Sequence, residues 1–205
     1  MESVLDRVIK QNTENINLLK TKDYNIFSVL QIQSKEVLIC RMIADLLNPR
    51  GQHGAGAEYL KIFLRDCLGM EKMDTKLVDQ AIVTAEYAID DERRIDIVIE
   101  IGSYFLPIEV KIYAADQKSQ CFDYYQYAKR RDAQAKVYYL TLDGHRPGKD
   151  STSSGSQSVP EEDIVCLSFR VHILNWLKAC KSCENTGMVP ILEQFIQNIE
   201  QISGY

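Results

Sequence analysis

The spacing of hydrophobic residues changes near residue 80. Before that point, apolar residues recur every three or four positions, which is typical of amphipathic helices. From 81 to 113 they alternate with polar residues, which predicts three strands, over 81–89, 93–101 and 105–113. A helix over 116–131 and a strand over 135–142 are expected next. This order of helices and strands predicts an α/β fold with a central mixed β-sheet flanked by helices.

We expect a single domain over 1–205, because this length can bury a substantial core without disulfides or a structural metal. Its helical N-terminal part covers 1–80, and the sheet with its following helix covers 81–142. Residues 143–162 are rich in Gly, Pro and Ser, which predicts a long flexible loop. A C-terminal strand and helices are expected over 163–205.

Composition and charge narrow the class of protein. No apolar run approaches the ~20 residues of a membrane helix, and the amphipathic residues 2–20 lack the unbroken apolar segment of a signal peptide. The six cysteines show no disulfide-framework spacing, so we expect reduced thiols and a cytoplasmic location. With 24 Lys plus Arg against 29 Asp plus Glu, the chain lacks the basic signature of many nucleic-acid-binding domains, although a local basic groove stays possible.

Three charged side chains fall within the most hydrophobic stretch. Successive side chains of a strand point to opposite faces, so Glu109 and Lys111 share one face of their strand. Ile95, Ile97, Ile99 and Ile101 should likewise share one face of the preceding strand, which leaves Asp96 on the other. With the turn near 102–104, antiparallel pairing places Asp96 beside Glu109 and Lys111.

This arrangement suits one particular chemistry. Neighbouring carboxylates repel each other unless a cation neutralises them, and carboxylate oxygens are ligands that Mg²⁺ and Mn²⁺ prefer. A lysine beside such a site can stabilise negative charge that develops on a phosphate. The pattern therefore fits metal-assisted phosphodiester hydrolysis. It also fits a surface ion pair between Asp96 and Lys111, and the pattern alone does not separate the two.

The motif formed by Asp96, Glu109, Val110 and Lys111, D-x(12)-E-V-K, resembles the signature of the PD-(D/E)XK nuclease superfamily. Gln120 and Tyr124 resemble the QxxxY motif of its RecB-like branch. Glu36 lies on a predicted helix before the sheet, where many members carry a glutamate, and segments between 24 and 180 resemble a bacterial group of standalone members. The resemblance implies a restriction-endonuclease-like three-layer core.

The resemblance also implies a role for each matching residue. Asp96, Glu109 and the Val110 carbonyl would hold Mg²⁺ or Mn²⁺, with Glu36 contributing directly or through water. Lys111 would position or activate the attacking water. The remaining roles are orientation of the lysine or a phosphate by Gln120, bracing of the helix or contact with DNA by Tyr124, and a ligand or phosphate contact by His53. His53 could instead be a solvated loop histidine.

DNA is the expected substrate, and Lys118, Arg93 and Arg94 form the expected basic patch for its backbone, with Lys129, Arg130 and Arg131 nearby. We expect a metal-dependent deoxyribonuclease of the bacterial cytoplasm that could act in restriction or phage defence, either as a monomer or as a homodimer. Two alternatives are a catalytically silent binding module with the same fold and a phosphohydrolase that acts on nucleotides in a closed pocket.

Overall fold

A five-stranded mixed sheet forms the centre of the fold. The computed structural model describes residues 24–183 and 186–204. The strands of this sheet are β1 (Ile82–Ala88), β2 (Arg94–Ile101), β3 (Tyr104–Lys111), β4 (Val137–Thr141) and β7 (Ile164–Ser168). They lie side by side in the order β1-β2-β3-β4-β7. The β1–β2 and β2–β3 pairs are antiparallel, whereas β3, β4 and β7 run parallel, so the predicted mixed sheet is confirmed.

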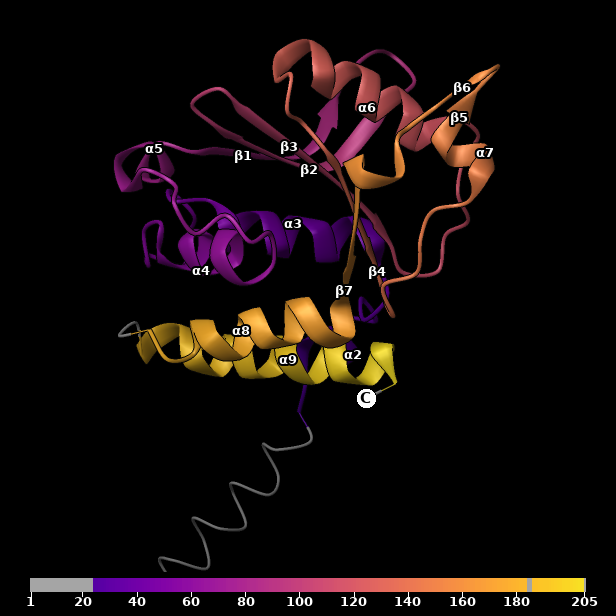
Figure 1. The fold of residues 1–205 in the computed structure, drawn as a ribbon. Coiled ribbons are helices and arrows are strands. Elements are labelled where there is room, and N and C mark those ends of the chain that lie inside the picture. The colour runs from indigo at the N-terminus through magenta and orange to yellow at the C-terminus, as the bar shows by residue number, and fades with distance from the viewer. Residues whose placement is uncertain (1–23, 184–185, 205) are drawn as a thin grey trace, which may run out of the picture.

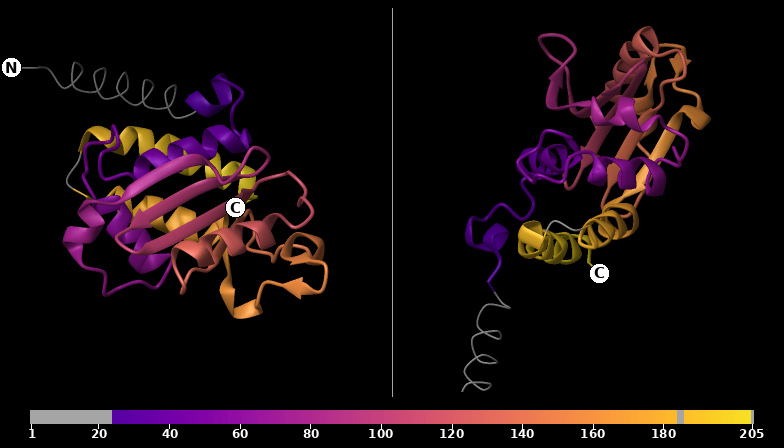
Figure 2. Two further views of the ribbon diagram at one scale, coloured as in Figure 1. Left: turned by 90° about the horizontal axis from the view of Figure 1, so that it is seen from above. Right: turned by 90° about the vertical axis from the view of Figure 1, so that its left-hand side faces the viewer.

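Helices cover both faces of this sheet (Figure 1). Helix α6 (Gln120–Arg131) packs on one face, and α3 (Glu36–Leu47) packs on the other with α4 (Glu58–Asp66) beside it. Helices α8 (Leu174–Cys180) and α9 (Val189–Ser203) lie beyond α3 and α4, as the views in Figure 2 also show. The predicted α/β architecture with flanking helices is therefore confirmed, and α8 and α9 add a further layer.

The segment predicted as a flexible loop contains regular structure. Within 143–162 the chain forms α7 (Lys149–Thr152) and a hairpin of β5 (Ser153–Ser154) and β6 (Gln157–Ser158), followed by a 3₁₀ turn at Glu161–Asp163. Ser151 is fully buried and accepts a hydrogen bond from the Cys121 backbone N–H. The Gly148 N–H donates to Asp116 Oδ2 at 2.7 Å. The prediction of a loop was wrong because these contacts, which hold the segment against the N-terminal end of α6, are not local in sequence.

The remaining elements are short. They are α2 (Ile26–Val29), α5 (Thr75–Asp79), a π-helix (Phe169–Ile173) that leads into α8, and a 3₁₀ turn (Thr186–Met188) before α9. The sequence pattern did not predict α5, whose N-cap is Asp74. The amphipathic segment over 2–20 lies outside the described residues.

Two apolar clusters hold the layers together. The larger one lies between the sheet and α3, α4, α8 and α9, and it includes Ile97, Ile99 and Ile101 of β2. The smaller one lies between the sheet and α6 and includes Val98. Ile95 was expected on the face of Ile97 but belongs to the smaller cluster.

Strand β2 is distorted at Asp96. Its pairing with β3 ends at Ile97, opposite Ile108. In β1, the residue opposite Asp96 is Glu86, which has a left-handed φ of 53° and interrupts the ladder. Because strict alternation of side chains requires a regular strand, the residue beyond this distortion can turn to the other face. The irregularity lies at the end of the sheet where the predicted site residues gather.

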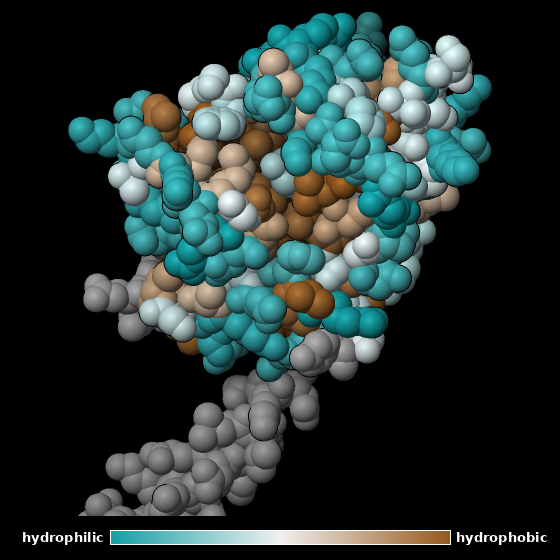
Figure 3. Space-filling view, viewed as in Figure 1, coloured by the Kyte–Doolittle hydropathy of each residue, from teal (hydrophilic) through white to brown (hydrophobic). Residues whose placement is uncertain are grey.

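The surface of the face shown in Figure 3 is hydrophilic around its rim, with hydrophobic residues gathered in a hollow near its centre. No helix among the described residues is long and apolar enough to cross a membrane. All six cysteines lie in the described part of the chain as free thiols, as the sequence predicted.

Candidate active site

A polar cavity of about 370 Å³ opens where β2 begins and β3 ends. Helices α3 and α6 also begin there, with Glu36 and Gln120 as their first residues. The cavity is lined by Glu36, Asp91, Glu92, Arg93, Arg94, Asp96, Glu109, Lys111, Gln117, Gln120 and Tyr124. Four element ends therefore bring together eight of the residues that the sequence placed at a metal, catalytic or nucleic-acid-binding site.

The register of β2 and β3 sets Asp96 next to Glu109. Ile97 lies opposite Ile108 in this antiparallel pair, so Asp96, one residue before Ile97, lies beside Glu109, one residue after Ile108, as the sequence predicted. The Val110 backbone N–H donates to Asp96 Oδ2 at 2.7 Å, which fixes one oxygen of this carboxylate. The side chain of Val110 points into the main core. Its carbonyl as a metal ligand stays a prediction.

Few groups of the protein offset the charge of the buried Glu109 carboxylate. Its side chain is 1% exposed, and that of Lys111 is 8% exposed. The Lys111 ammonium forms an ion pair with Glu109 Oε1 at 2.5 Å. Neither Glu109 oxygen accepts a hydrogen bond of regular geometry from the described residues. Because an unsatisfied buried carboxylate costs several kcal/mol, this arrangement is typical of a site where a further positive group is bound.

The electrostatics of the pair reflect this burial. Desolvation raises the pKa of Glu109 well above its ordinary value, and the negative charge of Asp96 raises it further. Desolvation also raises the pKa of Asp96, although the Val110 N–H opposes this effect. Burial alone would lower the pKa of Lys111, but the carboxyl groups of Glu109, Asp96 and Glu36 together outweigh burial and the pKa is raised. Lys111 therefore remains a cation next to two carboxyl groups.

Three further side chains frame this centre. Glu36 reaches the end of β3, where its Oε2 atom accepts a hydrogen bond from the Ile112 N–H at 2.8 Å. Gln120 is buried, and its Nε2 donates to the Tyr124 hydroxyl at 3.1 Å. The Tyr124 hydroxyl in turn donates to the Arg94 carbonyl at 2.5 Å. Tyr124 is 1% exposed, so its contacts support the predicted bracing of α6 and leave no ring face for DNA.

A comparison with protein families identifies this arrangement. A family model described as the PD-(D/E)XK nuclease superfamily matches residues 24–197. The chain belongs to this superfamily. No curated protein and no solved structure matches the chain. The predicted resemblance is thus confirmed at the level of the superfamily, which implies a hydrolytic nuclease with a nucleic-acid substrate.

PD-(D/E)XK nucleases typically use divalent metal ions, and the residues of the cavity fit such an ion. The observation that supports this fit is the buried carboxylate of Glu109 next to Asp96, because its oxygens accept no hydrogen bond of regular geometry from the described residues. Among the described residues no group of three or more His, Cys, Asp or Glu side chains is close enough to form a complete metal cage. Mg²⁺ rarely needs such a cage, because it commonly binds one or two carboxylates and keeps several waters.

The predicted basic rim of this nuclease is only partly supported. The Arg93 guanidinium donates to Asp123 Oδ2 at 3.0 Å, to Gln117 Oε1 at 2.8 Å and to the Lys118 carbonyl at 2.6 Å. Arg93 therefore ties the cavity wall together through three of its five N–H donors, and its contact with DNA stays a prediction. Arg94 and Lys118 are exposed, and neither side chain pairs with another residue in the described ranges.

The basic end of α6 also offers less positive charge than its sequence suggests. Lys129 forms an ion pair with Asp163 at 3.2 Å. Arg131 pairs with Glu100 at 2.5 Å. Two of these three cations are thus neutralised by neighbouring carboxylates, which leaves Arg130 as the least compensated of them.

His53 does not line the nuclease cavity. Its imidazole is 3% exposed and stacks on Tyr59. One ring nitrogen contacts the Asn48 carbonyl at 2.9 Å, and the other accepts from the Ala55 N–H at 3.1 Å. A side chain added at Gly51 would collide with this ring. These contacts support a role in shaping the loop between α3 and α4, in place of the predicted contact with a phosphate.

Sequence reasoning missed three residues of the lining. Asp91 and Glu92 lie in the turn between β1 and β2, and Gln117 lies just before α6. The signal for the turn was present, because an antiparallel neighbour of β2 must reverse at the end where β2 begins. No comparable signal existed for Gln117, whose position depends on the contact with Arg93.

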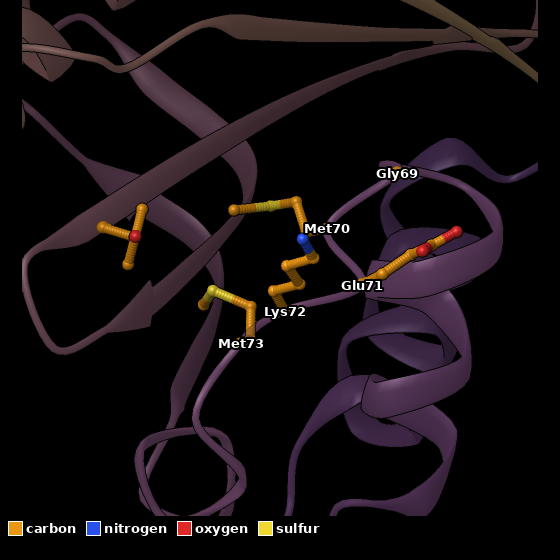
Figure 4. Close-up of a pocket in the computed structure, with 6 residues that line it drawn as sticks. Gly69, Met70, Glu71, Lys72 and Met73 are labelled. Atoms are coloured by element: carbon orange, nitrogen blue, oxygen red, sulfur yellow. The ribbon is translucent and has the colours of Figure 1, made fainter.

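A second hollow, of about 330 Å³, lacks the residues of an active site. It lies between the segment 69–73 and Tyr104, and its lining includes Met70 and Met73 (Figure 4). In the close-up, Glu71 points away from these two methionines. A single lysine, Lys72, is the remaining charged group, so this hollow brings together no set of residues for hydrolysis.

Proposed function

We propose that this protein is a divalent-metal-dependent nuclease that hydrolyses phosphodiester bonds in DNA. The observation that carries the proposal is the buried Glu109 carboxylate beside the half-buried Asp96, with the Lys111 ammonium 2.5 Å from Glu109, in a polar cavity. Burying these charges without a ligand destabilises the fold, so the arrangement is best explained by chemistry that requires it.

Asp96 and Glu109 would hold the ion, with Glu36 and the Val110 carbonyl as further candidate ligands. Mg²⁺ suits these oxygen donors, and Mn²⁺ is the alternative. A divalent ion bound here supplies positive charge and Lewis acidity to a phosphodiester. The ion is also needed for electrostatic reasons. The lining of the cavity contains five carboxylates and three cations, so without a bound metal ion it would repel a polyanion such as DNA.

The protein's own groups complete the site. Lys111 lies where its ammonium can orient a water molecule and stabilise negative charge on the phosphate as the bond to the attacking oxygen forms. Gln120, held by Tyr124, can orient the lysine or a phosphate oxygen. Glu36 is held at the end of β3 by the Ile112 N–H, which keeps its carboxylate beside Lys111.

Finer assignments rest on the sequence resemblance. They are the RecB-like branch, the bacterial standalone group, a role in restriction or phage defence, a cytoplasmic location and a homodimer. One observation favours the rival function, a silent binding module: the cavity is acidic, and Arg94 and Lys118 are the few uncompensated cations near it. The intact set of Asp96, Glu109 and Lys111 favours the nuclease.

A substrate panel tests the proposal. Purified protein with Mg²⁺ or Mn²⁺ should cut supercoiled and linear duplex DNA and leave free nucleotides intact. Cleavage of RNA alone would contradict the assignment of DNA, and hydrolysis of free nucleotides alone would favour a phosphohydrolase. No cleavage of any nucleic acid with either ion would favour the silent binding module.

Substitutions at two adjacent arginines should separate positioning from substrate binding. Arg94→Ala should raise KM for DNA several-fold with little change in kcat, and should reduce the slope of log affinity against log salt by about one. Arg93→Ala should instead lower kcat and cost about 1–3 kcal/mol of unfolding free energy, because three acceptors lose their donor. Steady-state kinetics at several salt concentrations and thermal unfolding distinguish the two. Equal effects of both substitutions would contradict the assignment.

A further inference from the structure

An apolar groove of about 700 Å³ lies between α2, α3 and α9, apart from the nuclease cavity. Its apolar lining consists of Ile26, Phe27, Ile32, Leu38, Met42 and Ile191. Large hydrophobic side chains are also exposed around it. Val29 and Leu30 are 56% and 58% exposed, and Tyr24, Val37 and Ile191 are exposed as well. Exposed hydrophobic side chains beside an apolar groove indicate a docking site.

We propose that residues 2–20 of the same chain dock in this groove as an amphipathic helix. Their apolar residues follow helical spacing: Val4, Leu5, Val8, Ile9, Ile16 and Leu19. A helix of this length is ~28 Å long, which is enough to run along α3. Such a stripe needs an apolar surface to pack on, and the groove provides one.

The place where the segment joins the described chain favours this occupant. Tyr24 lines the groove, so residue 23 leads directly to its edge. The Asn25 side chain donates to the Gln194 carbonyl at 2.7 Å, and the Ile26 N–H donates to Gln194 Oε1 at 2.9 Å. These bonds fix the entry of the chain on α9. A segment tethered there has a high effective concentration at the groove, which favours it over a free partner.

The connection is also suitable for a reversal of the chain. Residues 21–23, Thr-Lys-Asp, are polar and separate the apolar stripe from the first apolar residue of α2. Two helices packed side by side are commonly joined by two to eight residues. The segment can therefore fold back over α2 and α3 without spanning a gap.

A matched pair of neighbouring substitutions tests this docking by hydrogen exchange on the full chain. Ile16 belongs to the apolar stripe, whereas Asn17 lies on the polar side of the same helical wheel. Ile16→Asp and Asn17→Asp add the same charge to almost the same position. We expect Ile16→Asp to speed exchange at least tenfold both in residues 2–20 and in peptides covering 26–42. Asn17→Asp should leave both unchanged.

A reciprocal substitution in the groove completes the test. Ile191→Asp changes an exposed residue of α9 and should speed exchange in residues 2–20 if they cover it. Unchanged exchange in peptides covering 81–111 would verify that each variant keeps the sheet. Exchange of residues 2–20 at the rate of a free peptide would overturn the proposal. The proposal would also be overturned if the protection of residues 2–20 from exchange disappeared on dilution while the measured mass fell from dimer to monomer. The occupant of the groove would then be a second copy of the chain.

Discussion

Lys111→Met is expected to abolish cleavage of DNA while leaving the fold intact. The substitution keeps the length and apolar stem of the side chain but removes an ammonium that lies 2.5 Å from Glu109 in the cavity. Loss of one preorganised group that stabilises transition-state charge typically costs 10²–10³ in kcat. We therefore expect a fall in kcat of roughly 10³-fold, measured by plasmid cleavage under single-turnover conditions.

The matched control is Lys118→Met, which removes an ammonium from an exposed residue near the cavity. It should change kcat by less than about threefold and act through KM, because a surface phosphate contact contributes binding rather than chemistry. Circular dichroism and thermal unfolding of both variants check the fold. Activity of Lys111→Met close to that of the natural chain would remove Lys111 from the reaction.

Glu109→Gln is expected to stabilise the fold and to abolish cleavage of DNA. In the presence of a chelator, the natural chain buries two carboxyl groups, Asp96 and Glu109, beside the single ammonium of Lys111, whereas the variant balances one carboxylate with one ammonium. Removing the desolvated Glu109 carboxylate, which shares one ammonium with Asp96, is expected to raise the unfolding free energy by about 1–3 kcal/mol at pH 8. For a domain of this size that corresponds to a rise in Tm of roughly 2–12 °C. Cleavage should be lost.

The difference in stability between Glu109→Gln and the natural chain should increase with pH. Because the pKa of Glu109 is raised in the folded chain above its ordinary value of 4.5, the folded state holds a proton that the unfolded state releases. The contribution of Glu109 to stability is thus present below pH 4.5 and is lost as the pH rises through the folded pKa. The Tm of the variant minus that of the natural chain should be smallest near pH 4.5 and should grow toward pH 8.

Glu100→Gln on the neighbouring strand β2 provides the control. Glu100 is partly exposed and pairs with Arg131 near the surface, so its loss should change stability by less than about 1 kcal/mol. Adding Mg²⁺ should stabilise the natural chain and leave Glu109→Gln unchanged, because ligand binding to the folded state raises its stability. If Glu109→Gln were less stable than the natural chain at every pH, this would contradict the claim that the buried Glu109 carboxylate destabilises the fold.

Short-range patterns in the sequence were sufficient to predict the centre of this site. The alternation in β2 and β3 and the short turn between them fix the register that brings Asp96 beside Glu109. Alternation failed at Ile95, because the distortion at Asp96 and Glu86 depends on the neighbouring strand. A local rule cannot anticipate a defect that is created by pairing.

The surroundings of the site depend on contacts between distant segments, which the sequence alone did not reveal. Arg93 was predicted to bind DNA because it is basic, but its guanidinium is held by Gln117, the Lys118 carbonyl and Asp123. His53 was predicted to contact a phosphate, but it is buried in its own loop. In both cases the partners of the side chain lie in contacts that only the fold reveals.

The most direct test of the central claim is a titration of Mg²⁺ in a DNA cleavage assay with the natural chain and Asp96→Asn side by side. The substitution keeps the size of the side chain and an oxygen that can accept from the Val110 N–H, but removes the negative charge. Cleavage that requires the ion in the natural chain and is lost in Asp96→Asn is the predicted result. Cleavage that persists in the chelator, or in Asp96→Asn, would contradict the account.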